Sequence, residues 1–322
     1  MRFKVCLSLG VLLSVSVPTI TTAHDLHGLV AERSSLDPET RAKFDEVREL
    51  RRLLAARSAA TRDPSLEAVV QTTLKWTSGL VTVCFFDGIK EARDHVADVA
   101  ARWTASTSLK FDFGPQGNRR TCNATAPSDI RVSFVGSGYW SYVGTQSRLI
   151  DPNKQTLNLQ GMDRASFTEK DDGVILHEFG HAVGFEHEHQ SPVGGCNSQF
   201  NWNYLYTALG WSKAEVDRNM RQLDVSSTAN GLLTTAFDRK SIMLYSLSPA
   251  AFLNAASASC YIAEANNTLS AVDSQAMKTV YPSIAAGGAP APAGAMPAPP
   301  TAPDAIAAAQ QMRRLQDLVG GR

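Results

Sequence analysis

Three histidines and one glutamate within a short segment have the types and spacing of a metal-dependent catalytic site. Residues 177–187 read His-Glu-Phe-Gly-His-Ala-Val-Gly-Phe-Glu-His. Positions four residues apart lie on one face of a helix, so His177 and His181 can bind one ion together. Glu178 lies beside that face, close to the ion without needing to bind it. The segment therefore predicts a helix that carries two metal ligands and a carboxylate.

Gly184 and His187 complete this pattern. A glycine can adopt the left-handed conformation that ends a helix, so His187 can approach the ion from another direction. Three imidazoles leave one position for water, which is the arrangement of a catalytic zinc site. We therefore predict one catalytic Zn²⁺ ion bound by His177, His181 and His187.

The chemistry predicted for such a site is hydrolysis. Zinc lowers the pKa of its water toward neutrality and polarises a carbonyl group. Glu178 is predicted to be the general base, which takes the proton of the water and passes it to the leaving amine. The predicted function is a zinc-dependent endopeptidase that acts on protein or peptide substrates.

Other interpretations of the same residues stay open. They are a helix with surface histidines, a binding protein without turnover, and a zinc hydrolase with a non-peptide substrate. Glu178 argues against a binding protein, because a metal site without catalysis does not need this carboxylate. Around the site, His189 is predicted to be a neighbour and not a ligand, and Glu186 is predicted to be solvated.

The spacing H-E-x-x-H-x-x-G-x-x-H resembles the signature of the metzincin metalloproteases. Residues 241–245, which read Ser-Ile-Met-Leu-Tyr, resemble the Met-turn of the astacin-like branch, although Leu244 replaces the usual histidine. The resemblance implies that Met243 lies beneath the metal. It also implies that Tyr245 is an extra metal ligand or a hydrogen-bond donor to the transition-state oxyanion. A core methionine and a core tyrosine are the alternatives. Residues 268–273 resemble the entry to the last helix of matrixins, so the subfamily stays open.

The resemblance covers about residues 75–282 and implies an α+β, metzincin-like fold with two subdomains. A twisted mixed sheet with helices is expected above the substrate cleft, and an irregular lower subdomain with a C-terminal helix is expected below it. By the same resemblance, substrate pairs with an edge strand of the upper sheet, for which residues 139–145 are the candidate.

Hydrophobic periodicity agrees with a mixed sheet backed by helices. Strands are expected at 80–86, 109–113, 130–135, 139–145 and 156–159, and helices at 90–105, 213–223 and 273–280. The alternation at 109–113 and 130–135 is typical of half-buried strands. The chain from His187 to residue 213 is expected to be irregular.

Four cysteines remain after the predicted signal peptide: Cys84, Cys122, Cys196 and Cys260. An even number of cysteines in an exported protein favours structural disulfides, and spacing alone allows three connectivities. With the two subdomains that the resemblance implies, we predict the pairs Cys84–Cys122 and Cys196–Cys260. Pairing within each subdomain leaves the cleft free to adjust.

The amino terminus resembles an export signal. Arg2 and Lys4 precede an apolar run at 5–17, and small residues at 21–23 suit cleavage after Ala23. A membrane anchor is the alternative, but the run is shorter than the roughly 20 residues that a spanning helix needs. The mature protein is therefore predicted to be secreted and to lack a membrane anchor.

Residues 24–70 are predicted to be a propeptide, because the segment is charged, rich in arginine and broken at Asp63-Pro64. An ordinary helical arm is the alternative. Resemblance to astacins implies that cleavage frees an amino terminus that pairs with Glu188, whereas a solvated Glu188 is the alternative. The predicted boundaries are a signal peptide at 1–23, a propeptide at 24–70, a catalytic domain at 71–283, a linker at 284–304 and a tail at 305–322.

The charge balance predicts which partners are absent. Lys and Arg number 31, as do Asp and Glu, so the formal net charge is zero. Without a basic excess, nucleic acid is not an expected partner. Hydrophobic residues make up 43% of the chain, which is enough to bury a full core.

Overall fold

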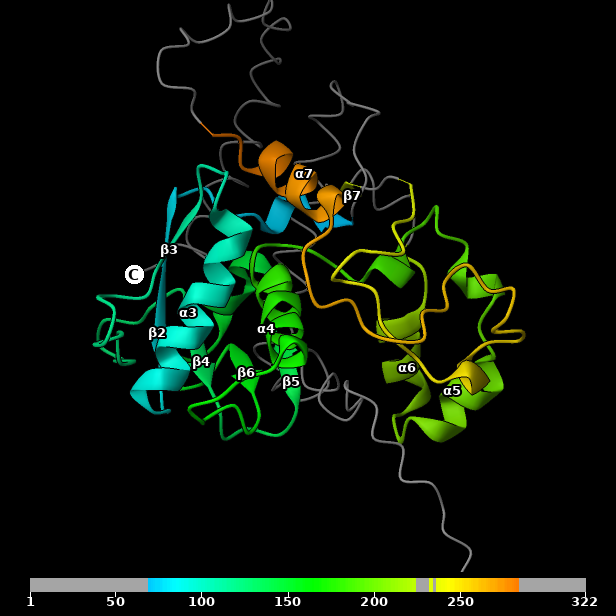
Figure 1. The fold of residues 1–322 in the computed structure, drawn as a ribbon, viewed down its shortest axis with the longest axis horizontal. Coiled ribbons are helices and arrows are strands. Elements are labelled where there is room, and N and C mark those ends of the chain that lie inside the picture. Colours follow the sequence, from blue (N-terminus) through cyan, green and yellow to red (C-terminus); the bar gives the residue numbers. More distant parts are fainter. Residues whose placement is uncertain (1–68, 224–231, 234–235, 284–322) are drawn as a thin grey trace, which may run out of the picture.

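The computed structural model describes residues 69–223, 232–233 and 236–283. The predicted signal peptide, linker and tail lie outside these residues, as does the predicted propeptide except for Val69 and Val70. None of the described helices is long and apolar enough to cross a membrane. The described chain forms an upper subdomain around a sheet and a lower subdomain of short helices and loops (Figure 1).

The upper subdomain contains a five-stranded sheet with the order β3-β2-β4-β6-β5. Its strands are β2 (Leu80–Phe85), β3 (Lys110–Asp112), β4 (Ile130–Ser133), β5 (Tyr139–Ser141) and β6 (Leu157–Leu159). Neighbouring strands are parallel except for β5, which runs antiparallel to β6 at one edge. The expected mixed α+β fold is thus confirmed. Of the segment 139–145 predicted as an edge strand, residues 139–141 form a strand at an edge, and the chain turns into a 3-10 helix from Gly144.

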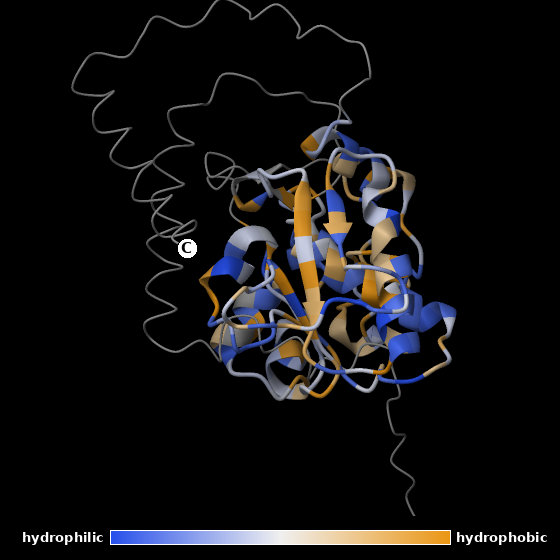
Figure 2. Cartoon of the chain, turned by 90° about the vertical axis from the view of Figure 1, so that its left-hand side faces the viewer, coloured by the Kyte–Doolittle hydropathy of each residue, from blue (hydrophilic) through white to orange (hydrophobic). Residues whose placement is uncertain are grey.

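Two helices pack side by side against this sheet (Figure 1). They are α3 (Lys90–Thr104) and α4 (Glu169–Ala182). The Trp103 indole in α3 donates a hydrogen bond to the Leu176 carbonyl in α4 at 2.7 Å. The Phe179 ring in α4 packs against Phe111 in β3, with centroids 5.3 Å apart. Figure 2 shows the strand beneath these helices, β2, in hydrophobic colours over most of its length.

Strand β4 is not the half-buried strand that its alternating sequence predicts, because all four of its residues are buried. Arg131 is only 1% exposed, although it lies opposite the apolar face of Ile130 and Val132. Its guanidinium donates hydrogen bonds to the main-chain carbonyls of Ser147 and Ile150 at 3.2 and 3.0 Å. The loop after β5 therefore covers this face of the sheet, and a polar side chain there is not a solvated one.

The lower subdomain has its own cluster of buried side chains, among them Phe200, Leu205, Tyr245 and Phe252. Its elements are η4 (Glu188–Gln190), η5 (Cys196–Ser198), α5 (Trp202–Ala208), α6 (Lys213–Met220) and η7 (Pro249–Ala251). Helix α5 lies in a segment predicted to be irregular. It has only seven residues and forms because the Asn201 side chain caps it by accepting from the Tyr204 amide at 3.2 Å.

Short elements complete the described chain. Helix α7 (Ala271–Val280) begins two residues before its predicted start, because Ser270 and Asp273 form a capping box. Strand β1 (Val70–Gln71) pairs antiparallel with β7 (Leu232–Leu233), and neither strand was predicted, since two residues give no periodic pattern. The 3-10 turns η2 (Thr72–Leu74) and η3 (Gly144–Leu149) flank β1 and β5.

The structure contains the two predicted disulfides, one in each subdomain. Cys84 pairs with Cys122 and Cys196 pairs with Cys260, so the predicted connectivity is confirmed.

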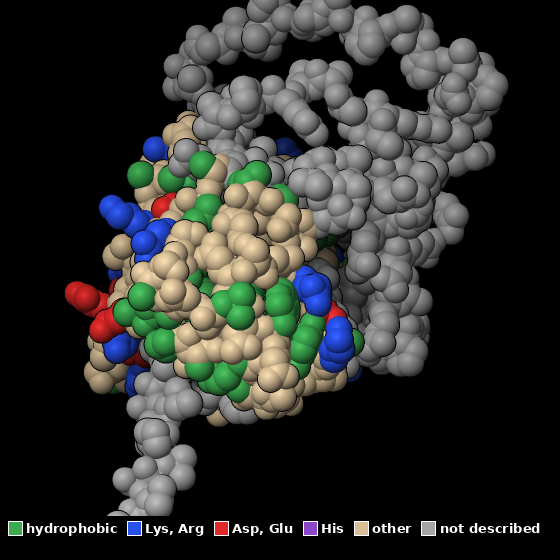
Figure 3. All heavy atoms as spheres, turned by 90° about the vertical axis from the view of Figure 1, so that its right-hand side faces the viewer, with side chains coloured by type: hydrophobic (Ala, Val, Ile, Leu, Met, Phe, Trp, Pro, Cys, Tyr) green, Lys and Arg blue, Asp and Glu red, His purple; other side chains and the backbone are tan. Residues whose placement is uncertain are grey.

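On the face of the molecule seen in Figure 3, uncharged side chains cover the middle, and Lys, Arg, Asp and Glu lie toward the borders.

Candidate metal centre

Helix α4 presents the first two histidines because both of its ends are fixed. The Thr168 hydroxyl accepts a hydrogen bond from the Asp171 amide, and the Asp171 carboxylate accepts one from the Thr168 amide at 2.7 Å. At the other end Gly184 has a φ of 106°, which residues with a side chain rarely adopt. The predicted helix and its glycine stop are therefore confirmed.

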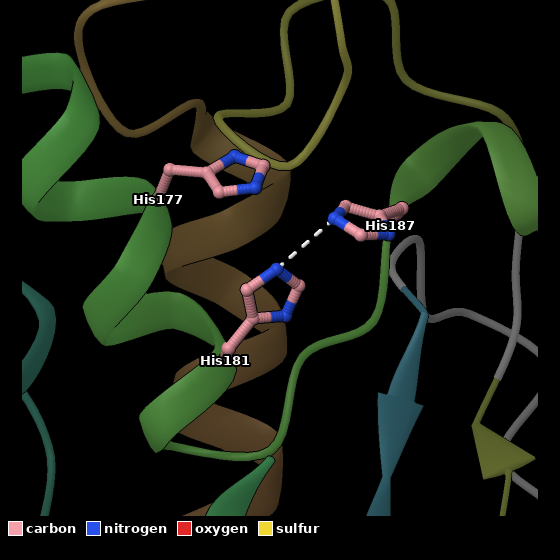
Figure 4. Close-up of side chains that lie close together, drawn as sticks. All are labelled: His177, His181 and His187. Atoms are coloured by element: carbon pink, nitrogen blue, oxygen red, sulfur yellow. Dashed lines mark hydrogen bonds between the residues drawn. The ribbon is translucent and has the colours of Figure 1, made fainter. Parts of the chain in front are cut away.

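Beyond Gly184 the chain brings His187 back to the helix. Figure 4 shows the rings of His177, His181 and His187 pointing toward one another. One nitrogen of each ring lies within 4.8 Å of the others, and the Nε2 atoms of His181 and His187 are 3.1 Å apart. All three side chains are at most 2% exposed. The structure thus brings together the three predicted ligands in a buried cluster.

The second ring nitrogen of each histidine tests whether the cluster fits zinc. The Nδ1 partners are Ile242 O for His177 (2.9 Å), Phe185 O for His181 (2.8 Å) and Gln190 Oε1 for His187 (3.2 Å). Since these oxygens can only accept, each Nδ1 is assigned the proton and each Nε2 keeps its lone pair. Three Nε2 lone pairs directed to one point are the donor set of a catalytic zinc ion.

Burial favours the neutral, metal-binding form of two of these imidazoles. It lowers the pKa of His181, and the hydrogen bond to the Phe185 carbonyl opposes this shift. Burial also holds the pKa of His187 well below its usual value, with a further contribution from the neighbouring histidines. Because a metal competes with protons for imidazole nitrogen, lowered pKa values favour metal binding near neutral pH.

Glu178 follows His177 on α4 and is only 2% exposed. A buried carboxylate costs free energy unless a partner or a cation is close to it. Glu178 thus adds a buried carboxyl group to the helix that carries His177 and His181. Behind the site, Ile175 and Phe179 are fully buried.

Residues 241–245 pass close to the histidines, as the Met-turn resemblance implies. Met243 is 1% exposed and packs against α4, where a Cβ added to Gly180 would lie 2.4 Å from its Sδ. The Tyr245 hydroxyl contacts His187 Nε2, and its ring lies 5.4 Å from that of His177. Tyr245 is thus a buried residue of the lower cluster whose hydroxyl reaches the metal position.

Two further polar residues lie close to the site. His189 is 1% exposed, its Nε2 lies 2.9 Å from the Asn219 carbonyl oxygen, and burial lowers its pKa to about 4. Glu186 was predicted to be solvated, but it is 7% exposed, because its segment runs beside Val69 and its amide donates to the Val69 carbonyl.

The sequence pattern left the environment of Glu188 open and did not identify Gln190 as a residue of the site. Glu188 is 2% exposed and accepts a hydrogen bond from the Asp238 amide at 2.9 Å, so the solvated alternative is wrong. Gln190 was not identified, although it follows His187 by three residues and lies in η4. That spacing within one turn is the signal that could have found it.

The fold and this histidine cluster define the class of a metzincin-type zinc metallopeptidase domain. The family model described as Astacin, which is a peptidase family, matches residues 68–282. The chain therefore belongs to the astacin family.

Known proteins agree with this assignment. The chain is 32% identical to a protein whose solved structure is described as "Structure of myroilysin", with 66% of this chain and 98% of that chain covered and a TM-score of 0.54. It is 34% identical to Blastula protease 10 of Paracentrotus lividus and 33% identical to Protein SpAN of Strongylocentrotus purpuratus. Each of these two matches extends over 104 residues, which is 32% of this chain and 14% of the sea urchin protein.

Proposed function

We propose that this chain is a secreted zinc endopeptidase with one catalytic ion bound by His177, His181 and His187. The observation that carries the proposal is the convergence of three buried Nε2 atoms, each opposite an Nδ1 held by a carbonyl oxygen. Its substrates are proteins or peptides, in keeping with its peptidase family.

Glu178 is the general base of the proposed mechanism. A bound zinc ion would supply Lewis acidity, which makes water a better nucleophile and the peptide carbonyl a better electrophile. The Glu178 carboxylate takes the proton of the attacking water and later delivers it to the leaving amine nitrogen. Its burial beside His177 keeps this proton transfer away from bulk solvent.

Tyr245 stabilises the charge that develops on the carbonyl oxygen during attack. Its hydroxyl lies at His187 Nε2 and can therefore donate to an oxygen next to the metal position. The ring packs between the histidines and the lower cluster, which keeps the hydroxyl close to the metal position.

Strand β5 aligns the substrate. It is one of the two edge strands of the sheet, and it packs against the helix that carries His177 and His181. A substrate in extended conformation can add to such an edge through main-chain hydrogen bonds. That position directs the peptide bond toward the histidine cluster.

The proposal includes export and activation. Residues 1–23 direct secretion, and the segment that follows is removed as a propeptide, which the disulfides of an exported protein support. Val69 and Val70 are at most 1% exposed, and Val70 forms a bridge with Phe185. These contacts favour a cut before Val69, two residues ahead of the predicted boundary after residue 70, so that both valines stay with the catalytic domain. The freed amino terminus then pairs with Glu188.

Activation is tested by N-terminal sequencing of secreted protein and by assaying a variant that cannot be cleaved. We expect a sequence that starts near residue 68 and higher activity in the cleaved form. Full activity of an intact chain beginning at His24 would refute the propeptide. Normal activity of Glu188→Gln would refute only the salt bridge.

The decisive experiment for the catalytic proposal compares wild type with Glu178→Gln in a protein-digestion assay, with and without a zinc chelator. Because Glu178 transfers a proton and does not bind metal, the variant should keep its zinc and lose activity at least about a hundredfold. His181→Ala should lose both zinc and activity. Near-normal digestion by zinc-loaded Glu178→Gln would exclude the mechanism.

A further inference from the structure

The third histidine of the cluster is held differently from the other two. Main-chain carbonyls accept from His177 and His181, and these groups are present whatever side chain the residue carries. His187 instead faces the side-chain amide of Gln190, with 3.2 Å between Nδ1 and Oε1. Of the three Nδ1 partners, only that of His187 belongs to a side chain.

A second contact fixes which end of the Gln190 amide faces the histidine. The amide nitrogen Nε2 donates to the Arg221 carbonyl at 3.1 Å, and a carbonyl can only accept. The amide oxygen is therefore turned toward His187, where it too can only accept. This arrangement requires the proton of His187 on Nδ1 and leaves the lone pair on Nε2.

The segment after α6, which supplies the Arg221 carbonyl, is held in place by further contacts. The Leu223 amide donates to the Gln190 carbonyl at 2.9 Å, which joins the end of the α6 segment to η4. The Arg221 guanidinium lies 4.3 Å from the Trp202 ring and donates to Asp217 at 2.6 Å. Gln190 is 3% exposed, so water does not readily replace these contacts.

We propose that Gln190 is the positioning residue of the third zinc ligand. Its amide, oriented by the Arg221 carbonyl, sets the tautomer and ring direction of His187 and thereby raises the affinity of the cluster for zinc. This inference rests on the proposed zinc function, which it deepens by linking metal affinity to the lower subdomain. Outer partners of metal-binding histidines typically contribute about 10–100-fold to affinity.

A purely structural role for Gln190 is the rival explanation, and a neighbouring glutamine separates the two. Gln222 joins the same segments. Its side-chain Nε2 donates to the Pro192 carbonyl at 3.0 Å, and its main-chain amide donates to the Asn197 side-chain oxygen at 2.9 Å. No hydrogen bond connects the described Gln222 side chain to a histidine of the cluster. The change Gln222→Met is therefore a matched control for Gln190→Met.

The test measures zinc affinity of the full mature protein by competition with a chelator. Gln190→Met should bind Zn²⁺ about 10–100-fold more weakly than wild type. Gln222→Met should stay within about threefold of wild type. Equal affinity in Gln190→Met and wild type would overturn the proposal, as would an equal loss in Gln222→Met.

A second readout covers the case in which Gln190→Met does not fold. In Co²⁺-substituted protein the visible bands report ligand geometry, so Gln190→Glu should shift them and Gln222→Met should not. Unchanged bands in Gln190→Glu would overturn the proposal. Wild type that binds no zinc would instead refute the proposed function itself, before any variant is compared.

Discussion

The two subdomains hold their parts of the metal centre by different means. In the upper one, α3 and α4 have 15 and 14 residues and pack on a sheet whose side chains form one large core. In the lower one, α5 and α6 have only 7 and 8 residues. Helices of that length are not stable alone and depend on capping, a disulfide and aromatic packing. His177, His181 and Glu178 thus belong to a framework of regular elements, whereas His187 belongs to one held by local contacts.

The Met-turn is the junction between these subdomains. Ile242 and Met243 pack in the upper core, and Tyr245, two residues later, packs in the lower cluster. Asp273 in α7 fixes the turn by accepting from the Ser241 hydroxyl at 2.8 Å and the Ile242 amide at 2.9 Å. Since the Ile242 carbonyl also faces His177, the C-terminal helix supports His177 through a single residue, Ile242.

The two disulfides give the largest expected effect and the most direct comparison. Replacing both cysteines of either pair by serine should lower the free energy of unfolding by about 4 kcal/mol, by the loop-entropy account. The sequence separations of 38 and 64 residues differ too little to distinguish the pairs. Local order should differ, because Cys84 lies in β2 and is also held by pairing with β4, whereas Cys260 is held through the Gln199 side chain.

Hydrogen exchange and denaturant unfolding check this expectation. Loss of Cys196–Cys260 should remove protection of the lower helices under native conditions, while loss of Cys84–Cys122 should leave the upper strands protected. An equal loss of hydrogen-exchange protection around the deleted disulfide in both double variants would show that the two subdomains depend on their disulfides to the same extent.

Tyr245→Phe tests whether the lower subdomain contributes to chemistry as well as to structure. The variant should fold and bind zinc, because the ring remains in its cluster, and its turnover should fall by about a hundredfold. Tyr261→Phe is the control, since Tyr261 packs on Phe252 in the same subdomain and should retain full activity. Unchanged turnover in Tyr245→Phe would leave only the core role of Tyr245.

Sequence patterns predicted the upper subdomain better than the lower for a physical reason. Strands such as β2 and helices such as α4 show their period over enough residues to be recognised, and the capping and glycine signals at Thr168 and Gly184 are local. The cluster of His177, His181 and His187 was predictable because one helix turn and one glycine stop determine its geometry. Strand β1 was not, since it exists only by pairing with β7.

Burial of polar residues was the harder part. Glu186 and Arg131 look solvated in sequence, yet each is covered by a segment distant along the chain. The role of Gln190 likewise depends on Arg221, which is 31 residues away. No local pattern encodes which loop will fold over a polar side chain, so these contacts appear only in three dimensions.

The smallest expected effect concerns the hydrogen bond that joins α5 to α6, which the Tyr206 hydroxyl donates to the Asp217 carboxylate. Partial burial would raise the pKa of Asp217, but hydrogen bonds from Lys213, Tyr206 and Arg221 outweigh it and lower that pKa to about 2 from 3.8. A carboxyl group whose pKa is lower in the folded than in the unfolded state stabilises the fold at pH values above its unfolded-state pKa. That contribution is lost as the pH falls from about 4 toward 2. For a partly exposed ion pair it should amount to less than about 1 kcal/mol.

The measurement is the free energy of unfolding in urea as a function of pH for wild type and Asp217→Asn. The difference between them should be largest above about pH 4 and should shrink toward pH 2, because asparagine does not titrate. Asp98→Asn is the control in the upper subdomain, where the Asp98 side chain is 64% exposed and pairs with Arg119 at 3.4 Å. A pH-independent difference for Asp217→Asn would mean that packing of the side chain, and not its charge, joins the two short helices.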